Sequence, residues 1–139
     1  MITQDILKTL AQHGIKPSPQ RMAVMEYLME HRTHPTVEEI YLALLPDIPT
    51  LSKTTVYNTL KVLVEQGAAL QLTINDKKTC YDADTSPHAH FLCTHCGKVS
   101  DIKLLNTELC NDAEIPLGYR VEQSDLYFRG LCRKCALKR

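Results

Sequence analysis

Hydrophobic residues in the first half of the chain recur every three or four positions, the spacing that places them on one face of an α-helix. Four such stripes occur, and they lie at 6–11, 24–28, 37–44 and 56–63. Ser18 before Pro19 is a helix start, because the hydroxyl can cap the first turn and proline fits its first position. The pattern therefore predicts four helices before residue 67.

Capping residues indicate where the last two of these helices begin and end. Thr36 is followed three positions later by Glu39, and this pair forms a capping box. Ser52 is the cap of the next helix, and Gly67 supplies the left-handed residue that ends it. These signals predict a short helix followed, across a turn, by a helix over residues 52–66.

The hydrophobic period then changes from 3.6 to 2. Apolar and polar residues alternate over 70–74, a polar turn follows at 75–78, and an extended stretch resumes at 79–81. A hairpin directly after two helices joined by a turn is the winged variant of the helix-turn-helix. We therefore expect a winged-helix domain over residues 1–82.

A second, smaller domain is expected over residues 88–139, after a linker. Residues 83–87, Ala-Asp-Thr-Ser-Pro, have the composition of a hinge. Beyond it the pattern predicts strands near 90–93 and 98–102, a helix near 104–113 and a strand through 119–129. A domain of about 50 residues buries little apolar surface, so it needs a metal, a partner subunit or both. The expected fold class is α+β.

Composition narrows the function without identifying it. The 139 residues carry 16 Lys+Arg and 16 Asp+Glu, and this neutrality excludes a broadly polybasic nucleic-acid binder. No apolar run approaches the roughly 20 residues of a membrane helix, and no basic stretch followed by an apolar one marks a secretory signal. We therefore expect a cytoplasmic protein. Of its six cysteines, those that cluster are metal ligands or redox thiols rather than structural disulfides.

Charge is distributed unevenly within the first half. Residues 48–64 hold two lysines but no acid, and the helix they include begins with hydroxyl, phenol and amide side chains. Such groups contact phosphates and base edges of DNA, although they could equally be caps on a helical surface without a ligand. The candidate DNA contacts are Arg21, Lys53, Thr55, Tyr57, Asn58 and Lys61. With so few positive charges, we expect a dimer on a two-fold site in double-stranded DNA.

Four of the six cysteines form two C-x-x-C pairs, Cys93 with Cys96 and Cys132 with Cys135. Two turns that each present two thiolates predict a tetrahedral structural zinc site, and nearby basic residues favour the thiolate form. The competing interpretation is a dithiol redox pair, which would require one C-x-x-C at a helix start after a strand. The two other cysteines are interpreted as small buried hydrophobic residues, and they are Cys80 and Cys110.

Histidines and carboxylates form a second candidate metal set. Two histidines separated by one residue face the same side of an extended strand, with acids before and after them. The whole set is His34, Asp82, His88, His90 and Asp101. These nitrogen and oxygen donors suit iron(II), manganese(II) or zinc. The remaining histidines are treated as incidental, and they are His13, His31 and His95.

Together these motifs resemble the ferric uptake regulator family of repressors over essentially the whole chain. The matching stretches are Ser18-Pro19-Gln20-Arg21, His34-Pro35-Thr36, Thr55-Val56-Tyr57-Asn58, Tyr81-Asp82, His88-Ala89-His90, Cys93-x-x-Cys96-Gly97-Lys98, Asp101 and Cys132-x-x-Cys135. The resemblance implies a homodimer, with an N-terminal winged helix-turn-helix domain and a small C-terminal α/β dimerisation domain with a four-cysteine zinc site. It also implies that the His/Asp set is the regulatory metal site, shared by both domains.

Three positions resemble the peroxide-responsive branch of that family. Asp82 and Asp101 stand where iron-responsive members typically carry Glu, and Asn58 stands where they carry Arg. In the peroxide branch, bound iron(II) reacts with hydrogen peroxide, oxidises a histidine ligand and releases the DNA. The resemblance therefore implies His34 and His90 as candidate targets. Many relatives have an auxiliary metal site that uses a further histidine, and residues 117–139 contain none.

The sequence thus predicts a metal-dependent DNA-binding transcriptional repressor that senses hydrogen peroxide through iron(II) or manganese(II) and carries structural zinc. The first alternative is an iron-, manganese-, zinc- or haem-responsive repressor of the same family. From another class, a mononuclear non-haem iron enzyme or a thiol oxidoreductase remains as an alternative. Neither would explain the wing and the recognition helix, so we expect a protein that is not an enzyme.

Overall fold

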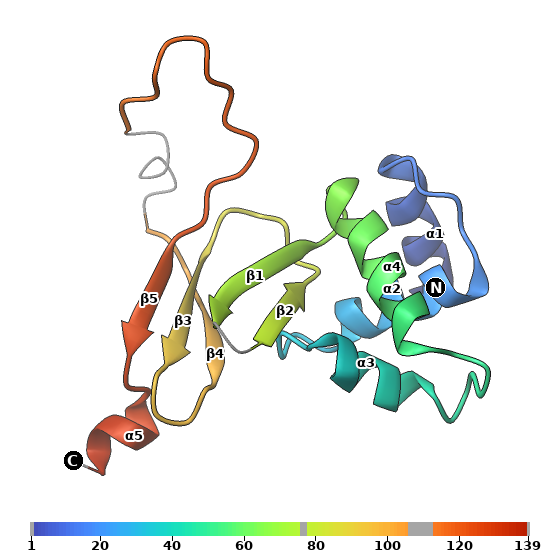
Figure 1. Ribbon diagram of the computed structural model, residues 1–139, viewed down its shortest axis with the longest axis horizontal. Helices are drawn as coiled ribbons and strands as arrows, with labels where there is room; N and C mark the ends of the chain where they lie inside the picture. The colour runs from blue at the N-terminus through green and yellow to red at the C-terminus, as the bar shows by residue number, and fades with distance from the viewer. Residues whose placement is uncertain (1, 76–77, 106–112, 139) are drawn as a thin grey trace. The chain divides into compact units, whose positions relative to one another are not determined.

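Four helices and a hairpin form the first of two units in our computed structural model, which describes residues 2–75, 78–105 and 113–138 (Figure 1). The division falls between Met1–Thr85 and Ser86–Arg139, inside the segment 83–87 to which the sequence assigns a hinge. The elements of the first unit are α1 (Ile2–Gln12), α2 (Pro19–Glu30), α3 (Val37–Leu44), α4 (Lys53–Glu65), β1 (Leu70–Asn75) and β2 (Lys78–Asp82).

The predicted capping residues start three of these helices. The hydroxyl of Ser18 accepts a hydrogen bond from the backbone N–H of Arg21 (3.2 Å), which fixes the first turn of α2. The Thr36 hydroxyl accepts from the Glu39 N–H at the start of α3 (3.2 Å), and Ser52 does the same for α4. The sequence therefore located these helix starts correctly, because each is decided by a local hydrogen bond.

A single hydrophobic core holds the first unit together. Every helix contributes at least one side chain that is almost completely buried, and these include Leu10, Leu28, Ile40 and Leu60. Tyr81 of the hairpin joins the same core. The four amphipathic stripes of the sequence thus meet, as their 3.6-residue period predicts.

The hairpin is tied to the loop that precedes α3. Strands β1 and β2 are antiparallel, with Leu72 opposite Cys80, and the tip residues 76–77 lie outside the described ranges. The backbone N–H of Tyr81 donates to the carbonyl of Pro35 (3.0 Å). With α3 and α4 as the helix-turn-helix, this arrangement confirms the predicted winged helix.

The second unit is built on a three-stranded sheet. Its elements are β3 (Ala89–Cys93), β4 (Val99–Ile102), β5 (Tyr127–Gly130) and α5 (Arg133–Leu137), and the strand order is β4-β3-β5. Strand β3 runs antiparallel to β4 and parallel to β5. The strands predicted near 90–93 and 98–102 are confirmed, whereas the helix predicted near 104–113 falls mainly on residues outside the described ranges.

The strand predicted through 119–129 is wrong over residues 119–126. Of the predicted stretch, only Tyr127–Gly130 forms a strand, which pairs with β3. Just before it, Leu126 accepts a hydrogen bond from the His90 backbone (3.2 Å), and the described part of the chain shows no strand pairing over 119–126. Apolar residues of that segment, such as Tyr119 and Val121, are exposed instead of packed. An extended stretch with the right composition still needs a neighbouring strand to satisfy its backbone groups. The short helix α5, in contrast, was not predicted at all.

Within the described ranges, no helix is long and apolar enough to cross a membrane.

Replacing Leu60 by Ala should destabilise the first unit by about 2–5 kcal/mol, because the change removes buried methyl groups and leaves a cavity. Urea denaturation followed by circular dichroism measures this free energy. Leu42, whose side chain is 58% exposed, is the matched control. Leu42→Ala should change stability by less than about 0.5 kcal/mol, and equal effects at the two positions would contradict the assigned core.

Candidate metal centres and recognition helix

The four cysteines of the two C-x-x-C pairs converge in the second unit. Cys93 ends β3 and Cys96 lies in the turn before β4, while Cys132 directly precedes α5 and Cys135 lies within it. Their four sulfur atoms all lie within 4.8 Å of one another. The Sγ atoms of Cys96 and Cys132 are 3.8 Å apart, far beyond a disulfide bond. Sulfurs at about 2.3 Å from a tetrahedral zinc would be separated by roughly 3.8 Å, so the cluster fits zinc.

Backbone hydrogen bonds hold the two cysteine turns beside each other. Gly97 closes the first turn with a φ of 80° and donates its N–H to the Cys93 carbonyl (2.9 Å). Thr94 donates both its N–H (2.8 Å) and its hydroxyl (3.1 Å) to the carbonyl of Gly130, at the end of β5. Because β3 and β5 pair in parallel, their ends lie side by side, and the Cys132/Cys135 pair after β5 therefore lies beside the Cys93/Cys96 pair at the end of β3.

The protein environment divides the four thiols into different protonation states. Hydrogen bonds from the backbone of Cys96 and Cys132 lower the pKa of Cys93 to about 5. A bond from the Cys135 backbone lowers the pKa of Cys132 as well. Desolvation, followed by hydrogen bonds with the other thiols, raises the pKa of Cys135 to about 12. The metal-free cluster thus holds at least one thiolate and one thiol near neutral pH.

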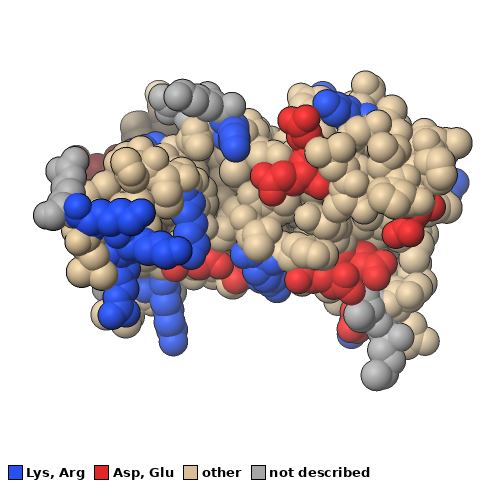
Figure 2. Space-filling view, turned by 90° about the horizontal axis from the view of Figure 1, so that it is seen from below, with Lys and Arg blue, Asp and Glu red and all other residues tan. Residues whose placement is uncertain are grey.

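Basic side chains gather over this end of the second unit (Figure 2). A cavity of about 750 Å³ opens beside the sulfurs, and its charged lining consists of Lys98, Arg133, Lys134 and Lys138. Four thiolates around Zn²⁺ leave a charge of −2, which these cations offset. His95 also lines the cavity, although the sequence treated it as incidental.

Two histidines and an aspartate meet within the second unit. Strand pairing puts His90 directly opposite Asp101. The Nε2 atoms of His88 and His90 each lie 3.4 Å from Oδ1 of Asp101. Donors about 2.1 Å from one ion are roughly 3.0–3.4 Å apart, so these three side chains fit a shared metal.

The backbone also sets the tautomer of His88. Its Nδ1 atom lies 2.7 Å from the carbonyl oxygen of Ser86. Since a carbonyl can only accept, Nδ1 carries the proton and a neutral ring keeps the Nε2 lone pair toward Asp101. Sequence reasoning missed this contribution of Ser86, because a backbone carbonyl leaves no signal in the residue types.

A second pair of candidate ligands lies within the first unit. The Nε2 atom of His34 is 3.5 Å from Oδ2 of Asp82, and both side chains are buried. His34 has a φ of 58°, a left-handed conformation that is uncommon for residues other than glycine, although Asn, Asp and His are enriched in it. Pro35, the residue after His34, accepts a hydrogen bond from the Tyr81 backbone. This bond holds the loop that contains His34 beside β2, the strand that carries Asp82. The five predicted ligands therefore divide into two in the first unit and three in the second.

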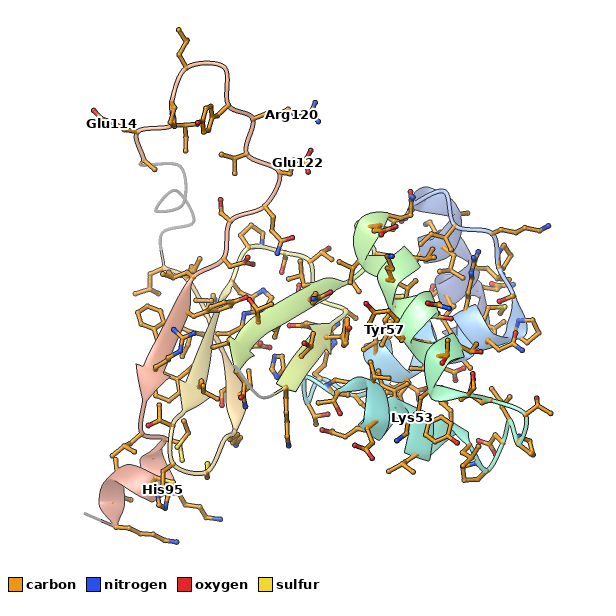
Figure 3. The ribbon with its side chains drawn as sticks, in the orientation of Figure 1. Lys53, Tyr57, His95, Glu114, Arg120 and Glu122 are labelled. Carbon is orange, nitrogen blue, oxygen red and sulfur yellow. The ribbon has the colours of Figure 1, made fainter. Side chains whose placement is uncertain are left out.

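The predicted recognition helix, α4, exposes some of the candidate DNA-contacting residues to solvent. Tyr57 is 53% exposed, and Asn58 and Lys61 are exposed as well. Lys53 and Tyr57 lie one turn apart on the helix (Figure 3). Thr55 is occupied in the cap, where its hydroxyl lies 2.9 Å from that of Ser52. Outside α4, the guanidinium of Arg21 donates to the Lys16 carbonyl (2.9 Å).

Known proteins share both the sequence and the fold. The model of the ferric uptake regulator family matches residues 12–129. A peroxide-responsive repressor PerR of Staphylococcus aureus (strain Mu50) is 37% identical over 134 residues, which cover 95% of this chain and 90% of the relative.

Two solved structures of peroxide regulators are also similar. The Campylobacter jejuni peroxide stress regulator has a TM-score of 0.70 at 30% identity, covering 95% of this chain and 97% of that one. PerR from Streptococcus pyogenes has a TM-score of 0.53 at 32% identity, covering 96% and 92% respectively.

The zinc affinity of the cysteine cluster should rise with pH. At pH 7 the Cys93 thiol is already ionised, whereas Cys135, with its pKa near 12, must lose a proton to become a ligand. We expect the affinity to rise about tenfold per pH unit, between pH 6 and 8, for each proton displaced. Competition with a chelating dye measures this slope.

Two variants test which cysteines are involved. Cys96→Ser should lower the zinc content and weaken dimerisation, whereas Cys80→Ala, which changes a buried cysteine of the hairpin, should retain full zinc. A pH-independent affinity, or a stable zinc-free Cys96→Ser dimer, would contradict the assignment.

Proposed function

The chain belongs to the ferric uptake regulator family, and from this membership we propose that it is a metal-dependent transcriptional repressor that senses hydrogen peroxide. The observation that carries the proposal is the 37% identity to a peroxide-responsive repressor over 95% of the chain. The residues Asn58, Asp82 and Asp101, which resemble the peroxide branch, support the same conclusion. The family consists of regulators rather than enzymes, and we place this protein in the cytoplasm.

Iron(II) or manganese(II) is the proposed regulatory metal, bound by ligands from both units. His34 and Asp82 supply two donors, and His88, His90 and Asp101 supply three. Neither set alone completes the coordination shell of such an ion, whereas five donors together nearly do. A shared ion therefore favours one arrangement of the units about the hinge at 83–87. DNA favours the same arrangement, so the two binding events are thermodynamically coupled.

The four-cysteine site is proposed to hold structural zinc in a dimerisation domain over 88–139. Zinc bound there contributes to folding, because the site does not exist in the unfolded chain. Exposed apolar side chains of the segment before β5 support a homodimer, since a second copy would cover them. They are Ile115, Leu117, Tyr119 and Val121.

Helix α4 is proposed to enter the major groove of DNA. Tyr57 and Asn58 would lie near base edges, whereas Lys53, Lys61 and Arg21 would lie nearer phosphates. Thr55, which caps the helix, would contact DNA from the first turn. A homodimer presents two such helices, which suits a two-fold operator.

Peroxide sensing needs a histidine beside the regulatory metal. Iron(II), when bound, supplies the reducing chemistry that cleaves hydrogen peroxide. His34 and His90, as buried donors, are the proposed targets. A ring carbon gains one oxygen atom while the other leaves as water, and the altered ring is a poorer ligand. The coupling between the units is then lost and the DNA is released.

His34→Ala should abolish the effect of metal on DNA binding, since it removes a ligand from the body of the first unit. Gel shifts with and without manganese(II) measure this effect. Zinc content and dimerisation should stay unchanged, because both depend on the second unit. The matched control is His31→Ala, which removes an exposed imidazole. Metal-dependent binding that survives in His34→Ala would refute the coupling.

Peroxide should add one oxygen to the iron-loaded protein, at His34 or His90. Peptide mass spectrometry locates the change, and the manganese-loaded protein is the control that should remain unmodified. Asp101→Glu should keep metal-dependent DNA binding but reduce the oxidation, because a longer carboxylate changes the exposure of the metal. Equal peroxide sensitivity in Asp101→Glu would favour the alternative, a plain metal-responsive repressor.

A further inference from the structure

Lys53, a proposed phosphate contact, forms an ion pair with the carboxylate of Glu38 in α3, the helix before α4. Its Nζ atom lies 3.5 Å from Oε1 of Glu38 in the first turn of α3. The same atom lies 5.8 Å from the centre of the Tyr41 ring, within the range of a cation–π interaction. Two side chains of α3, Glu38 and Tyr41, thus contact the lysine at the start of α4.

Glu38 is not required for the start of its own helix. The cap of α3 is made by Thr36 and Glu39, since the Thr36 hydroxyl accepts from the Glu39 N–H (3.2 Å) and donates to the Glu39 carboxylate (3.3 Å). The Glu38 side chain is exposed and points its charge toward Lys53. Besides adding negative charge to the first turn of α3, Glu38 therefore has one specific contact within the described part of the chain, the one with Lys53.

The acid also borders the surface that carries the recognition residues. A cavity of about 610 Å³ between α3, α4 and the hairpin is lined by Glu38, Tyr57 and Lys78, among others. In contrast, the first turn of α4 contains no acid. A negative charge at this edge repels the phosphates that approach α4.

We propose that Glu38 limits the affinity of the protein for DNA by competing with a phosphate for Lys53. This inference rests on the proposed function, in which α4 binds DNA. To bind a phosphate, Lys53 must leave Glu38, and the carboxylate then remains beside the DNA. Each effect weakens binding at every sequence, because phosphates carry no sequence information. The Glu38–Lys53 pair thereby weakens non-specific binding, in which the protein contacts only the phosphates of the DNA.

The salt dependence of binding reports this competition. Each phosphate neutralised by a free lysine releases a condensed counterion, which contributes about −0.9 to the slope of log K against log salt. A lysine that exchanges a carboxylate for a phosphate contributes less, since it was neutralised before binding. Removal of the Glu38 charge should therefore raise the affinity and steepen the slope together.

The test compares Glu38→Gln with wild type, both as zinc- and manganese-loaded dimers. The probes are a duplex enriched from a random pool by the wild-type protein and a scrambled version of it. At about 50 mM salt, we expect Glu38→Gln to bind both duplexes roughly three- to tenfold more tightly, with a slope steeper by about 0.9 per monomer bound.

Two further variants isolate the contact. Glu65→Gln removes the same charge from the other end of α4, about 18 Å from Lys53, which exceeds the Debye length. It should change the affinity less than twofold. In a Lys53→Ala background, Glu38→Gln should no longer steepen the slope.

The outcomes separate the inference from the proposed function. Wild-type protein that enriches no duplex from the random pool refutes both. Wild-type binding that Glu38→Gln leaves unchanged, or changes equally in the Lys53→Ala background, overturns the inference alone. An effect confined to the enriched duplex would make Glu38 a base-reading residue and would also overturn it. Parallel gains on both duplexes support it, provided that in the Lys53→Ala background the gain shrinks and the slope no longer steepens.

Discussion

Convergence of four cysteine sulfurs is the constraint on which the second unit depends. Among the described residues, the buried apolar side chains of that unit are few, namely Ala89, Leu92, Cys93 and Cys135, whereas the first unit buries a core from all four helices. Two of these four are themselves members of the cluster. A small domain with so little core usually needs a metal or a partner. Strand pairing brings the sulfurs together, and an ion bound there would hold the strands in return.

The candidate regulatory ligands place a different constraint on the molecule. The proposed ligands lie on a loop and a strand in the first unit, and on or beside two paired strands in the second. In the proposed function, one metal takes donors from both sets. Its binding would thereby be coupled to the arrangement in which the protein binds DNA.

The sequence predicted the features that local rules decide. Helix starts at Ser18, Thr36 and Ser52 followed from capping, and the cysteine cluster followed from spacing alone. The strand expected over 119–126 failed because pairing is a property of neighbours, which composition does not reveal. The orientation of His88 by a carbonyl, and the pairing of Lys53 with Glu38, depend on contacts between separate segments. Such contacts become visible only in three dimensions.

The left-handed backbone of His34 limits which donor atoms this position can present. Residues that tolerate this conformation best are Gly, Asn, Asp and His, and among these only His and Asp are common metal ligands. A cysteine there would add strain of about 1–2 kcal/mol. The backbone therefore favours a nitrogen or oxygen donor over a thiolate at position 34, and such donors suit metals of intermediate or hard character.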